Sequence, residues 1–229
     1  MNVLVFAPHP DDEILGCGGT MARHITEGDK VEVCIVTRGK PPVFQIDKEV
    51  YDKWPHNLYP EIIESHSMLG ISKTYLMEFP AVMMENVPRY KLNNAILILI
   101  RQCKPDIIYM PHFGDLQKDH TLTCESIMVA VRPKYEHIVR YVYAYETLSE
   151  TEWNNIPHGG NCFIPNVFVD ISDYLSKKLE ALDCYQSQLG QFPDPRSLET
   201  VESLAKFRGS TMGVKAAEAF MLIREYRNK

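Results

Sequence analysis

The stretch Asn2-Val-Leu-Val-Phe-Ala-Pro-His-Pro-Asp-Asp-Glu13 sets the expectations for both the fold and the chemistry of this 229-residue chain. Its first six residues form a continuous apolar run rich in β-branched and aromatic side chains, which is typical of a strand buried on both faces. A Pro-rich turn follows, and the chain then enters a helix predicted over residues 13–27. Glycines at 16, 18 and 19 would let this helix pack close to a sheet.

The alternation of strand and helix continues along most of the chain. Further strands are predicted at 30–37, 73–79, 106–111, 139–146 and 166–171, and further helices at 60–69, 90–103, 120–131, 172–185 and 198–207. The last element, 216–223, fits either a helix or a strand. We therefore predict a three-layer, Rossmann-like α/β domain with a mostly parallel sheet and the active site at the carboxyl ends of the strands. Because no linker or internal repeat is evident, we expect a single domain over residues 1–229.

Composition excludes several classes of function. Hydrophobic residues make up 45% of the chain, enough for a substantial core, and 24 basic against 30 acidic residues leave a net charge of −6. That balance argues against a surface that neutralises phosphates, so we expect no nucleic-acid partner. No apolar run is long enough to span a membrane, and we expect a cytoplasmic protein. The six cysteines form no C-x-x-C pair and are interpreted as thiols, mostly buried.

His9 and Asp12 lie directly after the first predicted strand, at the edge of the sheet where α/β proteins bind ligands. Imidazole nitrogen and carboxylate oxygen are both ligands that zinc accepts. Asp11 and Glu13 add two more carboxylates, whose mutual repulsion a divalent cation would relieve. An acidic helix N-terminus is the simpler explanation for Asp12 and Glu13, but it leaves His9 and the flanking prolines unexplained.

A catalytic zinc site needs about three protein ligands, and the third is expected from the carboxyl end of another strand. The loop after Pro111 offers His112, Asp115, Asp119 and His120. We favour His120, because Asp119 beside it could orient a metal-bound imidazole, while His112 competes for the role.

Pro8-His9-Pro10-Asp11-Asp12-Glu13, together with Asp115-x-x-x-Asp119-His120, resembles the PIG-L/LmbE family of zinc-dependent N-deacetylases, which remove acetyl groups from N-acetylglucosamine units. The resemblance implies that His9, Asp12 and His120 bind Zn²⁺, with another divalent ion such as Fe²⁺ as an alternative. It also implies that Asp11 is the general base, and it leaves His112 as a supporting or loop residue.

The sequence departs from the commoner family pattern at Gln117, where many members have a histidine three positions before the metal ligand. We expect Gln117 to keep a hydrogen-bonding role in catalysis. Arg38, at the end of the second strand, is the candidate for gripping the amino-sugar substrate, with Arg132, Glu146 and Arg196 as weaker candidates. The substrate is expected to be an N-acetylated amino sugar or its conjugate, and a homo-oligomer stays open.

Two alternatives compete with the hydrolase. A nucleotide-binding protein of similar fold is disfavoured, since the glycines at 16, 18 and 19 do not form G-x-G-x-x-G and follow an acidic loop. A metal-binding member of the family without catalysis is the second alternative, and Gln117 is the observation that suggests it.

Overall fold

The computed structural model describes residues 1–39, 57–134, 136–154 and 162–227, and within these ranges the strands form one seven-stranded sheet. The strand order is β3-β2-β1-β4-β5-β7-β6. The strands are β1 (Asn2–Ala7), β2 (Lys30–Thr37), β3 (Lys73–Phe79), β4 (Ile107–Pro111), β5 (Tyr141–Tyr145), β6 (Val167–Asp170) and β7 (Ala217–Glu225). The helices are α1 (Asp12–Thr26), α3 (Tyr59–Leu69), the short 3-10 helix η1 (Met84–Asn86), α4 (Arg89–Cys103), α5 (Lys118–Ala130), α6 (Leu175–Asp183) and α7 (Leu198–Ser210).

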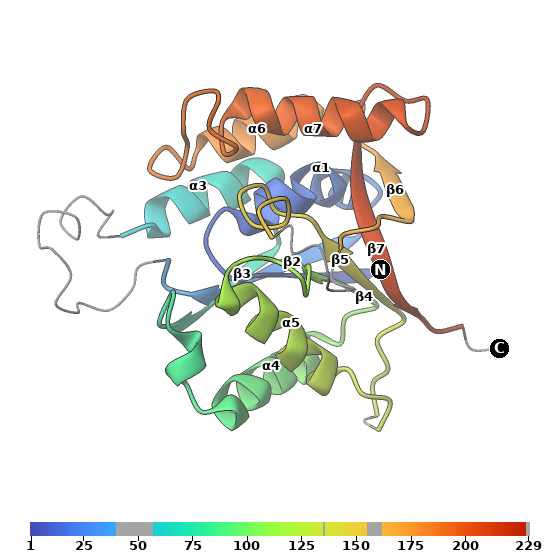
Figure 1. Cartoon of the computed structure of the whole chain (residues 1–229). Coiled ribbons are helices and arrows are strands. Elements are labelled where there is room, and N and C mark those ends of the chain that lie inside the picture. The colour runs from blue at the N-terminus through green and yellow to red at the C-terminus, as the bar shows by residue number, and fades with distance from the viewer. Residues whose placement is uncertain (40–56, 135, 155–161, 228–229) are drawn as a thin grey trace, which may run out of the picture.

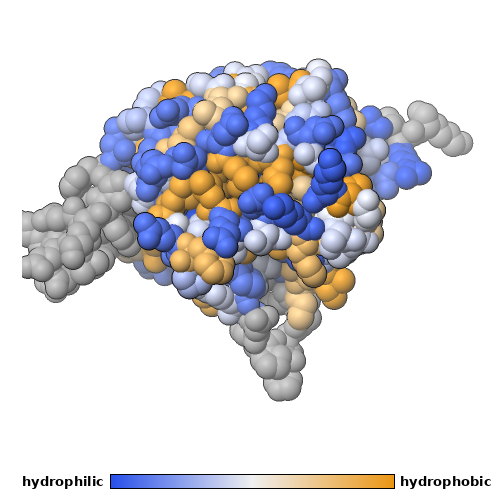
Figure 2. All heavy atoms as spheres, turned by 90° about the horizontal axis from the view of Figure 1, so that it is seen from above, coloured by the Kyte–Doolittle hydropathy of each residue, from blue (hydrophilic) through white to orange (hydrophobic). Residues whose placement is uncertain are grey.

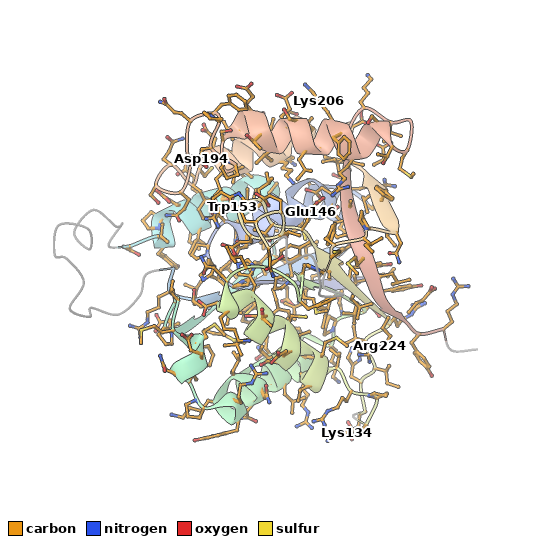
Figure 3. All side chains as sticks on the ribbon, in the orientation of Figure 1. Lys134, Glu146, Trp153, Asp194, Lys206 and Arg224 are labelled. Atoms are coloured by element: carbon orange, nitrogen blue, oxygen red, sulfur yellow. The ribbon has the colours of Figure 1, made fainter. Side chains whose placement is uncertain are left out.

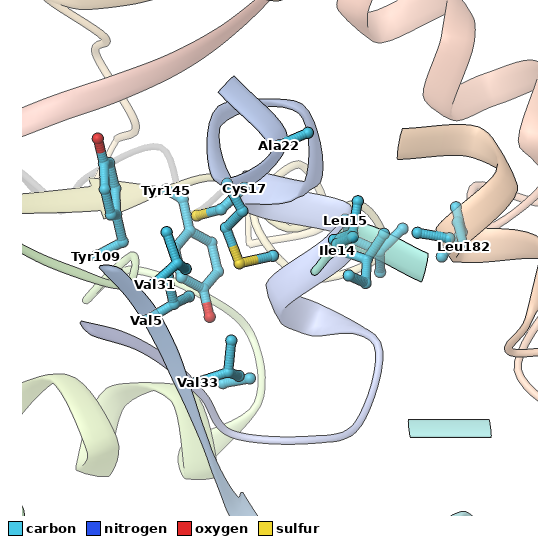
Figure 4. Packing of buried hydrophobic residues seen from close by; sticks show 14 of the residues in the cluster. Val5, Ile14, Leu15, Cys17, Ala22, Val31, Val33, Tyr109, Tyr145 and Leu182 are labelled. Atoms are coloured by element: carbon cyan, nitrogen blue, oxygen red, sulfur yellow. The ribbon is translucent and has the colours of Figure 1, made fainter. Parts of the chain in front are cut away.

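The sheet lies between two layers of helices, which confirms the predicted three-layer α/β architecture. Helices α1, α3, α6 and α7 cover one face, and α4 and α5 cover the other (Figure 1). Alternate residues of β1 serve the two layers: Val3 and Val5 join the core beneath α1, while Leu4 and Phe6 join the core beneath α4 and α5. Both faces of the first strand are therefore buried, as its continuous apolar run predicts. Figure 4 shows part of the core on the α1 side.

The sheet is mostly parallel, as predicted. β1 pairs in parallel with β2 and β4, and the β2–β3 and β4–β5 pairs are parallel as well. The ambiguous last element is a strand: β7 lies between β5 and β6 and is antiparallel to both. Its first four residues are buried, so a sequence rich in alanine and glutamate is strand because of its position in the sheet rather than its propensity.

Helix α1 packs unusually close to the sheet. A Cβ atom on Gly16 would lie 2.2 Å from the Tyr145 ring, and one on Gly19 would lie 2.7 Å from the Ile171 side chain. The Tyr145 hydroxyl in turn donates to the Phe6 carbonyl at 2.7 Å. These contacts confirm the role predicted for the glycines and fix the N-terminal end of α1 over the carboxyl ends of β1 and β5.

Most predicted boundaries agree with the structure to within two residues. Helix α6 is shorter than the predicted 172–185 because a turn at Ser172, whose backbone N–H donates to Asp170, precedes it. Residues 40–56, in the long segment between the predicted strand 30–37 and the predicted helix 60–69, lie outside the described residues.

No helix in the described ranges has the length and apolar character needed to cross a bilayer. All six cysteines are free, and Cys17, Cys34 and Cys124 are buried, whereas Cys162 is exposed. Seen from the side of α6 and α7, hydrophobic residues lie among hydrophilic ones on the surface (Figure 2).

Candidate metal centre

Three residues predicted as metal ligands converge at the carboxyl edge of the sheet. His9 lies in the turn after β1, Asp12 is the first residue of α1, and His120 lies in the first turn of α5. Since β1 and β4 are parallel neighbours, the loops that follow them meet at the same edge. One potential ligand atom from each residue lies within 4.8 Å of the other two. Asp12 Oδ2 is 3.4 Å from His9 Nδ1 and 3.3 Å from His120 Nε2.

The donor atoms of this cluster fit a cation. Asp12 and His120 are fully buried, yet Asp12 Oδ1 and His120 Nε2 have no hydrogen-bond partner. Buried polar atoms without partners are costly, and two imidazoles with a carboxylate form a ligand set suited to zinc. Burial alone would lower the pKa of His120, but Asp12 and Asp115 raise it well above its ordinary value. The two carboxylates around the His120 ring therefore favour a positive charge at this position.

A second His/Glu/Asp group, His24 with Glu27 and Asp29, does not pass the same test. His24 Nδ1 bonds to Asp29 at 2.7 Å and Nε2 bonds to the Tyr109 hydroxyl at 3.0 Å. Glu27 accepts a hydrogen bond from Arg23. Each ring nitrogen of His24 is therefore occupied, in contrast to the open Nε2 of His120.

Each histidine of the centre is oriented by its own carboxylate. His9 Nε2 lies 2.9 Å from Asp119 Oδ2, and His120 Nδ1 lies 2.9 Å from Asp115 Oδ2. The expectation that Asp119 orients His120 was wrong: its carboxylate instead accepts from the backbone N–H of Val82 at 2.6 Å and turns toward His9. The two pairs leave His9 Nδ1 and His120 Nε2 to face Asp12, as expected when second carboxylates orient metal-binding rings.

Asp11 stands beside the cluster without belonging to it. Its backbone has φ 102°, a left-handed conformation that is rare for a residue with a side chain. Its Oδ2 accepts from Arg196 Nη1 at 3.0 Å, whereas its buried Oδ1 has no hydrogen-bond partner. Burial raises the pKa of Asp11 to about 7 in the metal-free chain, against the lowering effect of Arg196. The free Oδ1 beside the candidate ligands is therefore available to accept a proton.

Glu13 supports the turn from behind. Its carboxylate accepts from the Asp11 backbone N–H at 3.2 Å and from the Tyr185 hydroxyl at 2.6 Å, and it lies 3.2 Å from His66 Nε2. Glu13 therefore holds the backbone of the turn and does not contribute to the cluster. The sequence offered no signal for these partners, because His66 lies in α3 and Tyr185 follows α6, both far from Glu13 in the sequence.

The predicted catalytic residue Gln117 and the predicted substrate residue Arg38 lie in different surroundings. Gln117 is the N-cap of α5, its backbone N–H donates to Glu150 Oε2 at 2.9 Å, and its side-chain Oε1 is buried without a hydrogen-bond partner. Arg38 lines a cavity of about 500 Å³ that also borders Pro10 and Tyr59. Its side chain is 64% exposed and its Nε donates to the Glu78 carbonyl, so it has freedom to reach a ligand.

Two of the weaker substrate candidates, Arg132 and Glu146, and the competing ligand candidate His112 have partners outside the cluster. Arg132 follows the C-terminal end of α5, opposite the end that carries His120, and bonds to the Val129 carbonyl. Glu146, labelled in Figure 3, accepts two hydrogen bonds from Arg208, at 2.8 and 2.6 Å. His112 is buried against the rings of Phe113 and Phe163.

Arg196 alone of this group reaches the centre, where it contacts Asp11. Nothing in the sequence pairs these two residues, which lie 185 positions apart.

A His-Asp-His cluster with an adjacent free carboxylate oxygen, at the carboxyl edge of a mostly parallel sheet, defines an α/β protein with a candidate hydrolytic metal centre. The chain belongs to the PIG-L family, described as GlcNAc-PI de-N-acetylase, which matches residues 4–131. That range contains every residue of the cluster.

One curated relative and two solved structures are similar to this chain over nearly its whole length. The diacetylchitobiose deacetylase of Thermococcus kodakarensis is 26% identical over 235 residues, covering 97% of this chain and 83% of that protein. The conserved protein TT1542 from Thermus thermophilus superposes with a TM-score of 0.77 at 25% identity, covering 100% and 97% of the two chains. GalB from Pseudomonas putida, a 4-carboxy-2-hydroxymuconate hydratase, shares the fold at 19% identity with a TM-score of 0.73, covering 100% and 99%. The fold alone therefore does not fix the reaction.

Proposed function

We propose that the chain is a metal-dependent N-deacetylase that hydrolyses the acetamide of an N-acetylglucosamine-type amino sugar or its conjugate, with residues 1–229 acting as one domain. The observation that carries this proposal is the convergence of His9, Asp12 and His120 around unpaired buried ligand atoms. Membership of a family described as GlcNAc-PI de-N-acetylase supports the substrate class. The similarity to a diacetylchitobiose deacetylase supports it further.

His9 Nδ1, the Asp12 carboxylate and His120 Nε2 would hold the ion, for which Zn²⁺ is the first candidate and Fe²⁺ an alternative. Bound zinc would supply Lewis acidity, which makes water more acidic and polarises an amide carbonyl. Asp115 and Asp119 keep the two imidazoles in the tautomers that present these nitrogens.

The remaining steps fall to the residues around the ligands. Asp11 accepts a proton from the attacking water at its free Oδ1 and hands it to the departing amine, so that the products are an amino sugar and acetate. Gln117 can donate a neutral hydrogen bond toward the developing oxyanion but has no proton to transfer. Arg38, beside the cavity at the ends of β1 and β2, would grip the sugar or its conjugate.

The test is a screen for amine release by the zinc-loaded protein, using N-acetylglucosamine, N,N'-diacetylchitobiose, nucleotide sugars and N-acetylated glycolipids. We expect release of a primary amine and of acetate that disappears on chelation and returns with zinc. Stoichiometric zinc binding without turnover of any compound would favour the metal-binding alternative. Tight nucleotide binding by a protein that takes up no metal would favour the nucleotide-binding one. A cytoplasmic location and a homo-oligomer stay predictions from the sequence.

A further inference from the structure

Arg196 enters the centre from the loop between α6 and α7 and contacts several groups at once. Its Nη1 donates to Asp11 Oδ2 at 3.0 Å and its Nε donates to Ser149 Oγ at 2.9 Å. Its Nη2 lies 4.0 Å from Asp12 Oδ1 and 4.0 Å from Glu150 Oε1. The planar guanidinium is thus fixed in orientation by two hydrogen bonds and surrounded by three carboxylates.

This arginine also differs in charge from the other partners of the site. The ion-pair partners of Asp12 in the described part of the chain are His9, His120 and Arg196, and that of Asp11 is Arg196. A guanidinium is not deprotonated in proteins, whereas imidazoles that bind a metal must be neutral. Arg196 is therefore the permanent positive charge of the centre.

The two oxygens of Asp11 are treated differently, and this difference gives Arg196 its role. Arg196 occupies Oδ2, while Oδ1 is buried and has no hydrogen-bond partner. Both Asp11 and Ser149, which anchor opposite parts of the guanidinium, have left-handed backbones, with φ 102° and φ 72°. Such conformations are costly for residues with side chains and tend to gather where a site needs them.

We propose that Arg196 is a positioning residue for the general base: it clamps Asp11 by Oδ2 so that Oδ1 is the oxygen that takes the proton. This inference rests on the proposed function. Arg196 fixes the tip of the Asp11 side chain through Oδ2, while the Glu13 carboxylate fixes the Asp11 backbone N–H. With a neutral glutamine at position 117, Arg196 also supplies fixed positive charge beside Asp11 and Asp12.

Arg196→Ala tests the clamp, and Arg208→Ala is its matched control. The two arginines are equally exposed, at 21% and 20% of the side chain, and each pairs with a carboxylate, but the partner of Arg208 is Glu146. We expect Arg196→Ala to lower kcat by about 10²-fold, because small misplacements of a catalytic group cost about that much. KM, zinc content and the melting temperature should match those of Arg208→Ala.

Rescue separates positioning from general structural support. Arg196→Lys should retain part of the wild-type kcat, and guanidinium ion added to Arg196→Ala should restore part of it. Guanidinium ion added to Asp11→Asn should restore none. A raised KM at unchanged kcat would instead make Arg196 a substrate contact and overturn the inference. Equal losses in Arg196→Ala and Arg208→Ala, or zinc loss in Arg196→Ala, would overturn it as well.

A wild-type protein that deacetylates nothing would end the proposed function without deciding the clamp. Crystal structures of wild type and Arg196→Ala then decide it separately. A displaced Asp11 carboxylate in the variant would support the clamp, and an unmoved one would refute it.

Discussion

The segment after β1 (residues 8–12, the first loop) and the segment after β4 (residues 112–120, the second loop) each bring a histidine to the centre, but they hold it differently. Each segment includes the first residues of the helix that follows it. His120 is oriented from within its own loop, by Asp115, whose other oxygen accepts from Thr151 at 2.6 Å. His9 has no such partner in its own loop and relies on Asp119, which belongs to the second loop. The first loop thus supplies two of the proposed ligands and the proposed base, while the second supplies one proposed ligand and both orienting carboxylates.

This difference means that the first loop depends on residues outside it for its conformation. Its backbone is held by Glu13, its ring by Asp119 and its base by Arg196, each contributed or secured from outside the turn. The second loop orients its own histidine through Asp115, and it is tied to the segment after β5 through Asp115 and to the segment before α4 through Asp119. We therefore expect changes in the first loop to alter both binding and chemistry, and changes in the second to alter binding first.

The largest expected effect is loss of the metal. His9→Ala or His120→Ala removes one of three protein ligands, so each variant should purify with little zinc and show no measurable deacetylation. Metal analysis alongside the amine-release assay checks this, with His24→Ala as a control because His24 belongs to the saturated second group. If His120→Ala retained full zinc occupancy, the ligand assignment would have to change.

Asp11→Asn should keep zinc and lose activity by about 10² or more, because the amide has the shape of the carboxylate but cannot accept the proton. The contrasting variant is Asp12→Asn, one position away, which should lose the metal itself. Near-normal turnover in Asp11→Asn would assign the base to another group. Glu13 is a poor substitute, since its carboxylate is already occupied by Tyr185, His66 and the backbone.

Gln117→Ala should slow turnover by up to about 10²-fold through loss of a neutral hydrogen-bond donor, without release of zinc. The Gln117 backbone N–H, which bonds to Glu150, is retained in this variant, so the loop should keep its shape. Unchanged kinetics on the true substrate would show that the side chain takes no part in catalysis, which would leave oxyanion stabilisation to other groups.

Asp119→Asn and Asp115→Asn compare the two loops directly. Removing an orienting carboxylate commonly weakens metal affinity by about 10- to 100-fold, and we expect effects in that range for each. Asp119→Asn should in addition lower kcat at saturating zinc, because the misplaced His9 shares its turn with Asp11. Zinc competition against a chelating dye gives the affinities. Identical kcat values at saturating zinc would remove the distinction between the loops.

Sequence reasoning captured the local features of this molecule. The strands and their order of appearance follow from apolar runs and turn residues, and the ligand-bearing turns follow from motifs only a few residues long. The strand β7 was ambiguous because Ala217, Glu218 and Ala219 favour a helix, and only their pairing between β5 and β6 makes them a strand.

The long-range partners of His9 and Asp11 could not be predicted from the sequence for a similar reason. The pairs Asp119 with His9 and Arg196 with Asp11 join positions 110 and 185 residues apart. Asp119 is adjacent to His120 in the sequence, and this adjacency led to the wrong prediction that it orients the His120 imidazole. Side-chain direction at the start of α5 decides the pairing, and it depends on the η1 segment whose backbone holds Asp119.

The smallest expected effect concerns Arg38, which follows β2 and so extends the comparison to a third strand end. Its side chain is largely exposed beside the cavity near Pro10, and its ion pair with Glu78 spans 3.8 Å in an equally exposed setting. A hydrogen bond to a sugar is worth about 0.5–1.5 kcal/mol, which corresponds to a change in binding of roughly 2- to 10-fold. We therefore expect Arg38→Ala to raise KM within that range and to leave kcat and zinc content unchanged. Arg132→Ala, which removes an exposed arginine at the far end of α5, is the matched control. Equal KM values for the two variants would show that Arg38 is an ordinary surface ion-pair residue. If Arg38→Ala raised KM more for conjugates than for free N-acetylglucosamine, the conjugate rather than the sugar would bind in this cavity.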